Sequence, residues 1–365
     1  MFSDRLRLAR SRAGMSLRDL SAAIGGEVSA QAIGKYENGE MMPSAKVLTL
    51  LGKSLGVSLD FLMSNQVAGL EGVEFRDSKK TGTRQLSQIE SIVIDAVERY
   101  LMIEDVLEIT DNGPHLGLFV DQHVDSWADA DRLAGGLRDH WKLGNDSLAN
   151  ITGLLEDKGF KIVEADLPDR VDGLTCLVRR TDDREPLPVI VLKRDAPLER
   201  RRFTLCHELA HRVIATVSPG LDKEKVMHRF SGAFLMPEDH LWLEAGGRSR
   251  RGFARAELIR MKHIYGVSAV ALLMRLVAIG VLSESGLSFA FQTYARGWRT
   301  IEPLPITPQP GLWGAEKPER FMVLVYQALA EHMISVPRAA QLLGKSLGEI
   351  ELAMKGPALG EADRH

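Results

Sequence analysis

The first 65 residues carry apolar side chains at helical spacing. Leucine and isoleucine recur three, four or seven positions apart, between short segments rich in glycine or serine. The pattern predicts helices over residues 17–24, 30–37 and 45–55. Two short helices joined by a tight, glycine-containing turn are typical of a helix-turn-helix, so we expect an all-helical domain over residues 1–65.

A single amphipathic helix dominates residues 66–125. A short alternation at residues 73–76 is typical of a strand, and helical periodicity follows over residues 85–108. One face of that helix is apolar and comprises Ile89, Ile92, Val93, Ala96, Val97 and Tyr100. Because such a stripe needs a partner, we expect a connecting helix that contributes to a homodimer interface, although the stripe could equally pack within its own chain.

Strand and helix patterns alternate over residues 126–245. The predicted strands, recognised by β-branched residues in alternation, are residues 161–163, 173–179 and 189–192. Helical spacing predicts helices over residues 127–141 and 148–158, and another that begins near residue 200. This region is therefore expected to combine helices with a small sheet.

The rest of the chain is predicted to be helical. Residues 246–302 contain two helical patterns with a basic edge, formed by Arg248, Arg250, Arg251, Arg255, Arg260 and Lys262. We expect a solvated face there, with single-stranded nucleic acid or a protein partner as the alternative. Residues 303–365 begin with a proline-rich linker and close with helices. The fold class predicted for the whole chain is α+β, mostly helical.

Composition and charge narrow the possible functions. With 365 residues, 45% hydrophobic and 26% charged, the chain resembles an ordinary globular protein of two or three domains. Its two cysteines suit a reducing compartment, and its most apolar run is broken by Arg275, so we expect a cytoplasmic protein without a membrane span. A net charge of −3 means that any surface for nucleic acid must be local.

The helix predicted to begin near residue 200 carries His207-Glu208-Leu209-Ala210-His211. Two imidazoles at positions i and i+4 share a helix face, so both can reach one metal ion, and neutral imidazole suits Zn²⁺. Glu208 can accept a proton from a water beside that metal. A solvated histidine pair is the alternative, but the apolar neighbours of this motif favour a buried helix face.

The first 65 residues resemble the Xre family, the lambda-repressor-like helix-turn-helix proteins. The residues that carry the resemblance are Leu6, Arg7, Arg10, Gly14, Met15, Ser16, Leu20, residues 23–25, Ser29, Ile33, residues 36–39, Pro43 and residues 48–61. The resemblance implies a double-stranded DNA operator as partner, with the helix from Ser29 in the major groove. Gln31 would read adenine, Ser29 or Lys35 would contact phosphate or base, and Asn38 at the end of this helix is also expected to bind DNA. A dimerisation module without DNA binding is the alternative.

Residues 127–245 resemble the ImmA/IrrE family of zinc metallopeptidases. The resemblance rests on the run from Arg202 to Arg212 and on a second pattern that places Glu224 ahead of Arg229-Phe230 and residues 234–237. Residues 155–159 and 172–173 agree with it. The resemblance implies a zincin-like domain with Zn²⁺ as cofactor.

Two residues compete for the position of the third metal ligand. Alignment with the family places the glutamate ligand at Glu224. However, Met227 and His228 replace the small residue and the asparagine usual in the family, and His228 lies four residues after Glu224 on the same helix face. His228 is therefore an alternative ligand or a substrate-polarising group. Cys206 is expected to be a buried structural thiol.

The predicted function is DNA-binding transcriptional regulation coupled to a zinc metallopeptidase site. Zn²⁺ held by His207, His211 and Glu224 would activate a water, with Glu208 as the proton acceptor. The resemblance implies a repressor-like or antitoxin-like protein as substrate. One alternative is a non-proteolytic, antitoxin-type regulator that uses the peptidase fold as a sensor or toxin-binding scaffold, and another is a structural zinc domain.

Overall fold

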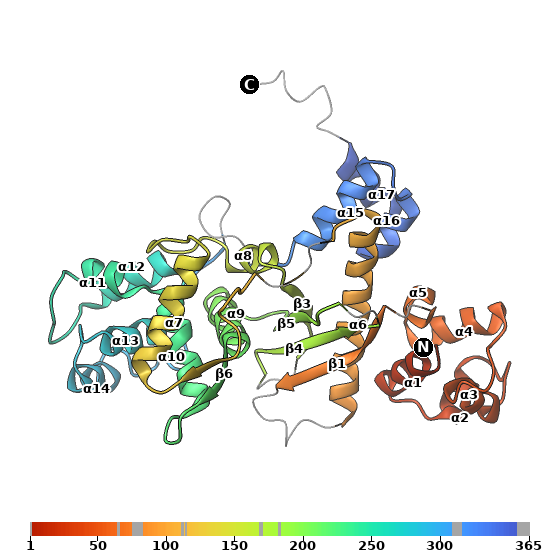
Figure 1. Ribbon diagram of the computed structural model, residues 1–365, viewed down its shortest axis with the longest axis horizontal. Helices are drawn as coiled ribbons and strands as arrows, with labels where there is room; N and C mark the ends of the chain where they lie inside the picture. Colours follow the sequence, from red (N-terminus) through yellow and green to blue (C-terminus); the bar gives the residue numbers. More distant parts are fainter. Residues whose placement is uncertain are drawn as a thin grey trace.

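The structure, a computed structural model, describes residues 2–63, 66–74, 83–110, 113, 115–167, 171–181, 184–308 and 316–355. Figure 1 shows an elongated molecule with the N-terminal helices at one end, a sheet near the centre and a further helical group at the other end. Most of the described residues are helical, so the predicted mixed and mostly helical class is confirmed.

The N-terminal end is a helical bundle. Its helices are α1 (Phe2–Ala13), α2 (Leu17–Ala23), α3 (Ala30–Glu37), α4 (Ala45–Leu55) and α5 (Leu59–Met63). Ser16, Ser29 and Ser44 cap α2, α3 and α4 by accepting backbone N–H groups, and Gly56 ends α4 in the left-handed region with φ of 64°. These caps explain why the bounds of α3 and α4 agree with the prediction, whereas α2 ends at Ala23, one residue before its predicted end.

A four-stranded sheet lies beside this bundle. Its strands are β1 (Val67–Glu74), β3 (Lys161–Ala165), β4 (Gly173–Arg180) and β5 (Leu187–Lys193). They are ordered β1-β4-β5-β3, with β3 parallel to β5 and the other pairs antiparallel. The strand predicted at residues 73–76 begins earlier, and residues 75 and 76 lie outside the described residues. Because β1 joins this sheet, the sheet crosses the domain boundary predicted at residue 125.

The long helix α6 (Thr83–Val106) stands next to the sheet in Figure 1. It packs against α1, β1 and β3, and its C-terminal half packs against the last helices of the chain. In the predicted apolar stripe, Val93 and Val97 are fully buried, and Ile92 packs partly buried against the same core. This stripe therefore packs within its own chain, which is the alternative stated above, and these contacts leave little of it for a dimer interface.

The metal-binding motif belongs to a second helical layer. Its elements are β2 (Gln122–Val124), α7 (Trp127–His140), α8 (Ile151–Asp157), α9 (Leu198–Val213), β6 (Ile214–Val217), α10 (Lys223–Leu235), α11 (Glu238–Glu244), α12 (Arg255–Tyr265), α13 (Ala269–Ala278) and α14 (Glu284–Gln292). Strands β2 and β6 form a parallel pair. One continuous hydrophobic core joins α7 to α14 with one face of β5, and α9 runs through it.

The chain closes with α15 (Arg320–Ala330), α16 (Val336–Leu343) and α17 (Leu347–Met354), which pack on the end of α6. Within the described ranges, no single helix has the length and apolarity of a membrane span, and only α12 and α13, bent by 94°, meet those criteria when taken together. The predicted basic edge at residues 248–262 is not uniformly solvated, because the ammonium group of Lys262 is buried against Glu199.

Candidate metal centre and nucleic-acid interface

Helices α9 and α10 bring three metal-ligating side chains together. The Nε2 atoms of His207 and His211 lie 3.2 Å apart, one turn from each other on α9. Glu224, in the first turn of α10, places Oε2 3.3 Å from Nε2 of His207 and Oε1 3.7 Å from Nε2 of His211. Tetrahedral ligand atoms at zinc distances of about 2.0–2.1 Å are about 3.3–3.4 Å apart. The donor set therefore fits a tetrahedral metal ion with one position open.

His228 lies beside this donor set without joining it. One donor atom from each of His207, His211 and Glu224 falls within a group whose atoms lie within 4.8 Å of one another, and His228 is not a member of that group. Its ring packs against the ring of His207, with centroids 4.9 Å apart, and against Phe203 at 5.7 Å. Of the two alternatives for the third ligand, the structure brings Glu224 and not His228 into reach.

Glu208 lies on the side of α9 that faces β4. A Cβ added to Gly173 of β4 would lie 2.5 Å from Cγ2 of Thr204, so the helix and the strand touch there, and Glu208 follows Thr204 by four residues on the same helix face. Burial raises the pKa of the Cys176 thiol in β4 to about 12. The charge of Arg212 lowers this pKa, and the charge of Glu208 raises it. Glu208 is only 6% exposed and is not a member of the donor group.

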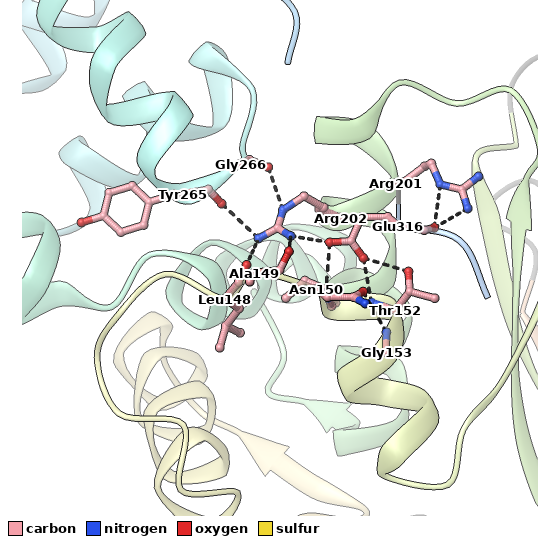
Figure 2. A network of polar contacts seen from close by, with 11 residues as sticks. Leu148, Ala149, Asn150, Thr152, Gly153, Arg201, Arg202, Tyr265, Gly266 and Glu316 are labelled. Atoms are coloured by element: carbon pink, nitrogen blue, oxygen red, sulfur yellow. Dashed lines mark hydrogen bonds and ion pairs between the residues drawn. The ribbon is translucent and has the colours of Figure 1, made fainter. Parts of the chain in front are cut away.

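A buried ion pair holds α9 in place ahead of the metal motif. The guanidinium of Arg202 is buried against the carboxylate of Glu316, which precedes α15 (Figure 2). Arg202 also donates to backbone oxygens at 2.6–3.4 Å, those of Leu148, Ala149, Tyr265 and Gly266. Glu316 accepts from the N–H groups of Ile151 and Thr152 at 3.0 and 2.7 Å, which are the first two of α8. The pair thus ties α9 to α8 and to the C-terminal segment.

Two further charged groups fix the same layer. Lys262 of α12 donates to Glu199 in the first turn of α9 at 2.9 Å, and both side chains are buried. Asp131 of α7 binds both Arg229 of α10 and Arg275 of α13, at 3.0 and 2.7 Å. These contacts tie α9 to α12, and α10 to α7 and α13. Sequence reasoning missed Glu316 because no motif or spacing links it to Arg202.

The predicted DNA-reading residues lie on and around α3. Gln31 and Lys35 are exposed, and the Ser29 hydroxyl accepts from Ala32 N at 3.2 Å. Asn38 is exposed at the end of the helix, where its amide donates to Glu40 at 3.1 Å and accepts from Arg7 at 3.3 Å. Ser29 and Asn38 therefore have structural partners, whereas Gln31 and Lys35 point to solvent.

Buried contacts hold α3 against α1. Arg10 donates to both carboxylate oxygens of Glu37, at 2.6 and 2.9 Å, and this contact raises the pKa of Arg10. Ile33 and Tyr36 pack on the inner side of the same helix. The outer side of α3 is thereby turned away from the bundle, as base reading in the major groove requires.

Two family models match separate parts of the chain. Residues 6–62 match the family model described as Helix-turn-helix, and residues 155–277 match the one described as IrrE N-terminal-like domain. The second match continues past residue 245 into α13.

A curated relative supports the first match. The SPbeta prophage-derived uncharacterized HTH-type transcriptional regulator YonR of Bacillus subtilis (strain 168) is 36% identical over 81 residues, which is 22% of this chain and 73% of YonR. The solved structure of ComR from S. thermophilus, in complex with DNA and its signalling peptide ComS, aligns with 97% of this chain and 98% of ComR. At 13% identity and a TM-score of 0.18, that alignment carries no argument. The chain therefore belongs to the DNA-binding helix-turn-helix transcriptional regulators, and it carries an IrrE N-terminal-like domain behind its DNA-binding helices.

Proposed function

We propose that this regulator binds Zn²⁺ at His207, His211 and Glu224 and hydrolyses a peptide bond in a repressor-like or antitoxin-like protein. The observation that carries the proposal is the donor set itself, in which the two imidazole nitrogens and a carboxylate oxygen are 3.2–3.7 Å apart. Three protein ligands with one open position are typical of catalytic zinc sites, whereas structural sites use four.

The residues of the chain divide the chemistry between them. Zn²⁺ bound there supplies Lewis acidity, which polarises a scissile carbonyl and acidifies water. The carboxylate of Glu208 accepts the proton of the attacking water and later delivers it to the leaving amine. The burial of Glu208 and its neighbours excludes bulk water and strengthens these interactions. The ring of His228, next to His207, is placed to contact the substrate carbonyl or its flanking groups.

Incubation with the proteins encoded beside this gene tests the proposal. The wild-type chain should cleave one of them, and Glu208→Gln should keep its zinc and lose cleavage, because Glu208 is the proton acceptor and not a ligand. Cleavage sites are read by mass spectrometry. Equal cleavage by Glu208→Gln would contradict the mechanism. Zinc binding with stable capture of a neighbouring toxin, and no cleavage, would instead support the antitoxin-type alternative.

We also propose that the chain binds its operator as a homodimer. The first 65 residues carry eight basic and six acidic residues, a net charge of only +2, and Lys46 is paired with Glu27 at 2.8 Å. A monomer therefore has few phosphate contacts, and a dimer doubles them across two half-sites. Because α6 is covered within its own chain, the dimer must use another surface. Sedimentation on DNA with one and with two half-sites tests this, and a 1:1 complex on both would contradict it.

A further inference from the structure

The sheet edge next to the metal-bearing helix is filled by a strand from the N-terminal half of the chain. Helix α9 packs against β4 and β5, and β4 would be the edge strand of this layer if β1 were absent. Gly173 and Thr175 are alternate residues of β4 and share the face on which Gly173 touches Thr204 of α9. Because Glu208 follows Thr204 by one helical turn, the middle of β4 runs beside Glu208.

Strand β1 lies along this part of β4. It runs antiparallel to β4, with Gly69 opposite Arg179, Glu71 opposite Leu177 and Glu74 opposite Thr175. An extended peptide that adds to a sheet edge makes the same kind of main-chain pairing. The backbone of β1 therefore occupies the position that a peptide segment would take to reach the neighbourhood of Glu208.

Several features make β1 locally irregular, although its ladder with β4 is extensive. Its pairing is irregular between Val67 and Gly69 and again between Glu71 and Glu74, and Gly72 has φ of 60°. Glycine within a strand weakens it, because glycine has no side chain to pack and loses the most entropy on ordering. The ion pair of Glu71 with Arg179 has side chains 47% and 59% exposed, and such pairs stabilise little.

We propose that the edge of β4 is a docking site for an extended segment of a protein partner, and that β1 is its resident occupant. A partner binds beside the metal centre by displacing β1. The inference rests on the proposed metallopeptidase function for the fate of the bound segment, whereas the docking itself needs only the sheet edge.

Displacement of β1 directly changes a contact of the DNA-binding helices. Arg5 of α1 is buried, donates to the carbonyl oxygen of Val67 at 2.7 Å and pairs with Glu98 of α6. The carbonyl oxygen of Gln66 accepts from Thr181 N at 2.9 Å. A segment that replaces β1 removes the Val67 acceptor from Arg5. Docking on β4 thus changes the seating of the helix-turn-helix bundle, which gives the partner control over DNA binding.

A reversible disulfide between β1 and β4 tests the inference. Gly69 and Arg179 are opposite each other in the ladder, and a Cβ at Gly69 has free space around it, so Gly69→Cys with Arg179→Cys places two thiols across the strands; thiol titration checks that the cross-link forms. The native Cys176 is buried with a pKa raised to about 12, which keeps it out of mild oxidation. The probe is a fluorescent nine-residue peptide with the sequence of residues 66–74, and its affinity is measured by anisotropy.

The oxidised double variant should bind this peptide at least tenfold more weakly than the same protein after reduction. Gly69→Cys alone, treated with the same oxidant, is the matched control and should not change. Leu70→Ala trims the packing of β1 on the core and should bind the peptide several-fold more tightly than the wild type. Equal binding by the oxidised and reduced proteins, or no saturable binding by Leu70→Ala, would overturn the inference.

A second readout separates this inference from the proposed peptidase activity. Peptide binding is repeated in a Glu208→Gln background, where no cleavage is expected. If the disulfide blocks peptide binding, and neither the wild type nor its active-site variants cleave a protein, the docking site is upheld and the peptidase proposal is contradicted. Cleavage of a protein substrate at the same rate by the oxidised and the reduced double variant would instead uphold the peptidase proposal and contradict the docking site.

Discussion

Helices α3 and α9 both carry functional side chains, but they are built in opposite ways. Helix α3 buries Ile33, Tyr36 and Glu37 and turns its other side to solvent, where Gln31 and Lys35 are exposed. Helix α9 buries twelve of its sixteen residues, and among them are charged side chains that need partners inside the protein. A helix that reads an external partner needs one packed face, whereas a helix that holds a metal ion must be fixed on nearly all sides.

The difference predicts where substitutions do their damage. On α3, the removal of an exposed side chain should change recognition and leave the fold intact. Around α9, the removal of one charge leaves its buried partner uncompensated, which costs several kcal/mol.

Loss of a metal ligand should give the largest effect. His207→Ala or His211→Ala should abolish stoichiometric zinc, and Glu224→Ala should weaken it strongly, because the three donors together form the site. His228→Ala and Glu208→Gln are matched controls that should retain the metal. Zinc per chain is measured by plasma mass spectrometry. Normal zinc in Glu224→Ala, with loss in His228→Ala, would reverse the assignment of the third ligand.

Removal of Glu316 should destabilise the fold. Glu316→Ala leaves the guanidinium of Arg202 buried without its carboxylate, and a broken buried pair costs about 3–5 kcal/mol. Lys317→Ala, at an exposed neighbour, should change the free energy of unfolding by no more than about 0.5 kcal/mol. Urea denaturation measures both. Equal midpoints for Glu316→Ala and the wild type would show that the buried half does not depend on its internal charges.

Stability should fall between mildly acidic and neutral pH because of Glu156. Burial raises the pKa of Glu156 from 4.5 to about 7, although the N–H groups of Glu319 and Arg320 donate to its carboxylate. Between these values the folded chain keeps the proton and the unfolded chain has lost it. The free energy of unfolding therefore decreases as pH rises through this window, by about 3 kcal/mol.

Glu156→Gln isolates this contribution. The amide keeps an oxygen acceptor for the two N–H groups but does not titrate, so the slope between pH 5 and pH 7 should flatten. Urea denaturation at several pH values checks it, with Asp157→Asn as the exposed control. An unchanged slope in Glu156→Gln would assign the pH dependence to other groups.

Changes on α3 should have the smallest effects on the fold and still change recognition. Gln31→Ala should cost about 1–3 kcal/mol at one base position of the operator and leave the unfolding midpoint unchanged. Lys35→Ala should weaken binding to all sequences and lower the slope of log affinity against log salt by about one. Titrations with a selected operator and its single-base variants measure both. If Lys35→Ala changed only one base position, Lys35 would be a base-reading residue.

Local sequence patterns predicted the helix bounds and the histidine pair, because these features depend on residues close together in the chain. The caps at Ser29 and Ser44 and the glycine at position 56 are visible in the sequence, so α3 and α4 were placed with correct bounds. His207 and His211 are recognisable from their spacing on one helix. These features depend on backbone chemistry within one or two turns.

Contacts between residues far apart in the sequence could not be predicted, for a physical reason. The apolar stripe of α6 shows that a partner is needed but does not say which surface provides it, and the chain supplies that surface itself. Glu316 lies 114 residues from Arg202, and β1 pairs with β4 across the predicted domain boundary. An exposed glutamate and a buried one look the same in a sequence, and only the packing distinguishes them.

X-ray absorption at the zinc edge, recorded on the full chain loaded with one equivalent of Zn²⁺, tests the central claim most directly. Two imidazole nitrogens at about 2.0–2.1 Å, further oxygen ligands and no sulfur are expected from His207, His211 and Glu224 with one open position. In His211→Ala this protein-bound spectrum should be lost, because that variant is expected not to hold stoichiometric zinc. A sulfur shell near about 2.3 Å, or a spectrum unchanged by His211→Ala, would contradict a catalytic metal centre on α9.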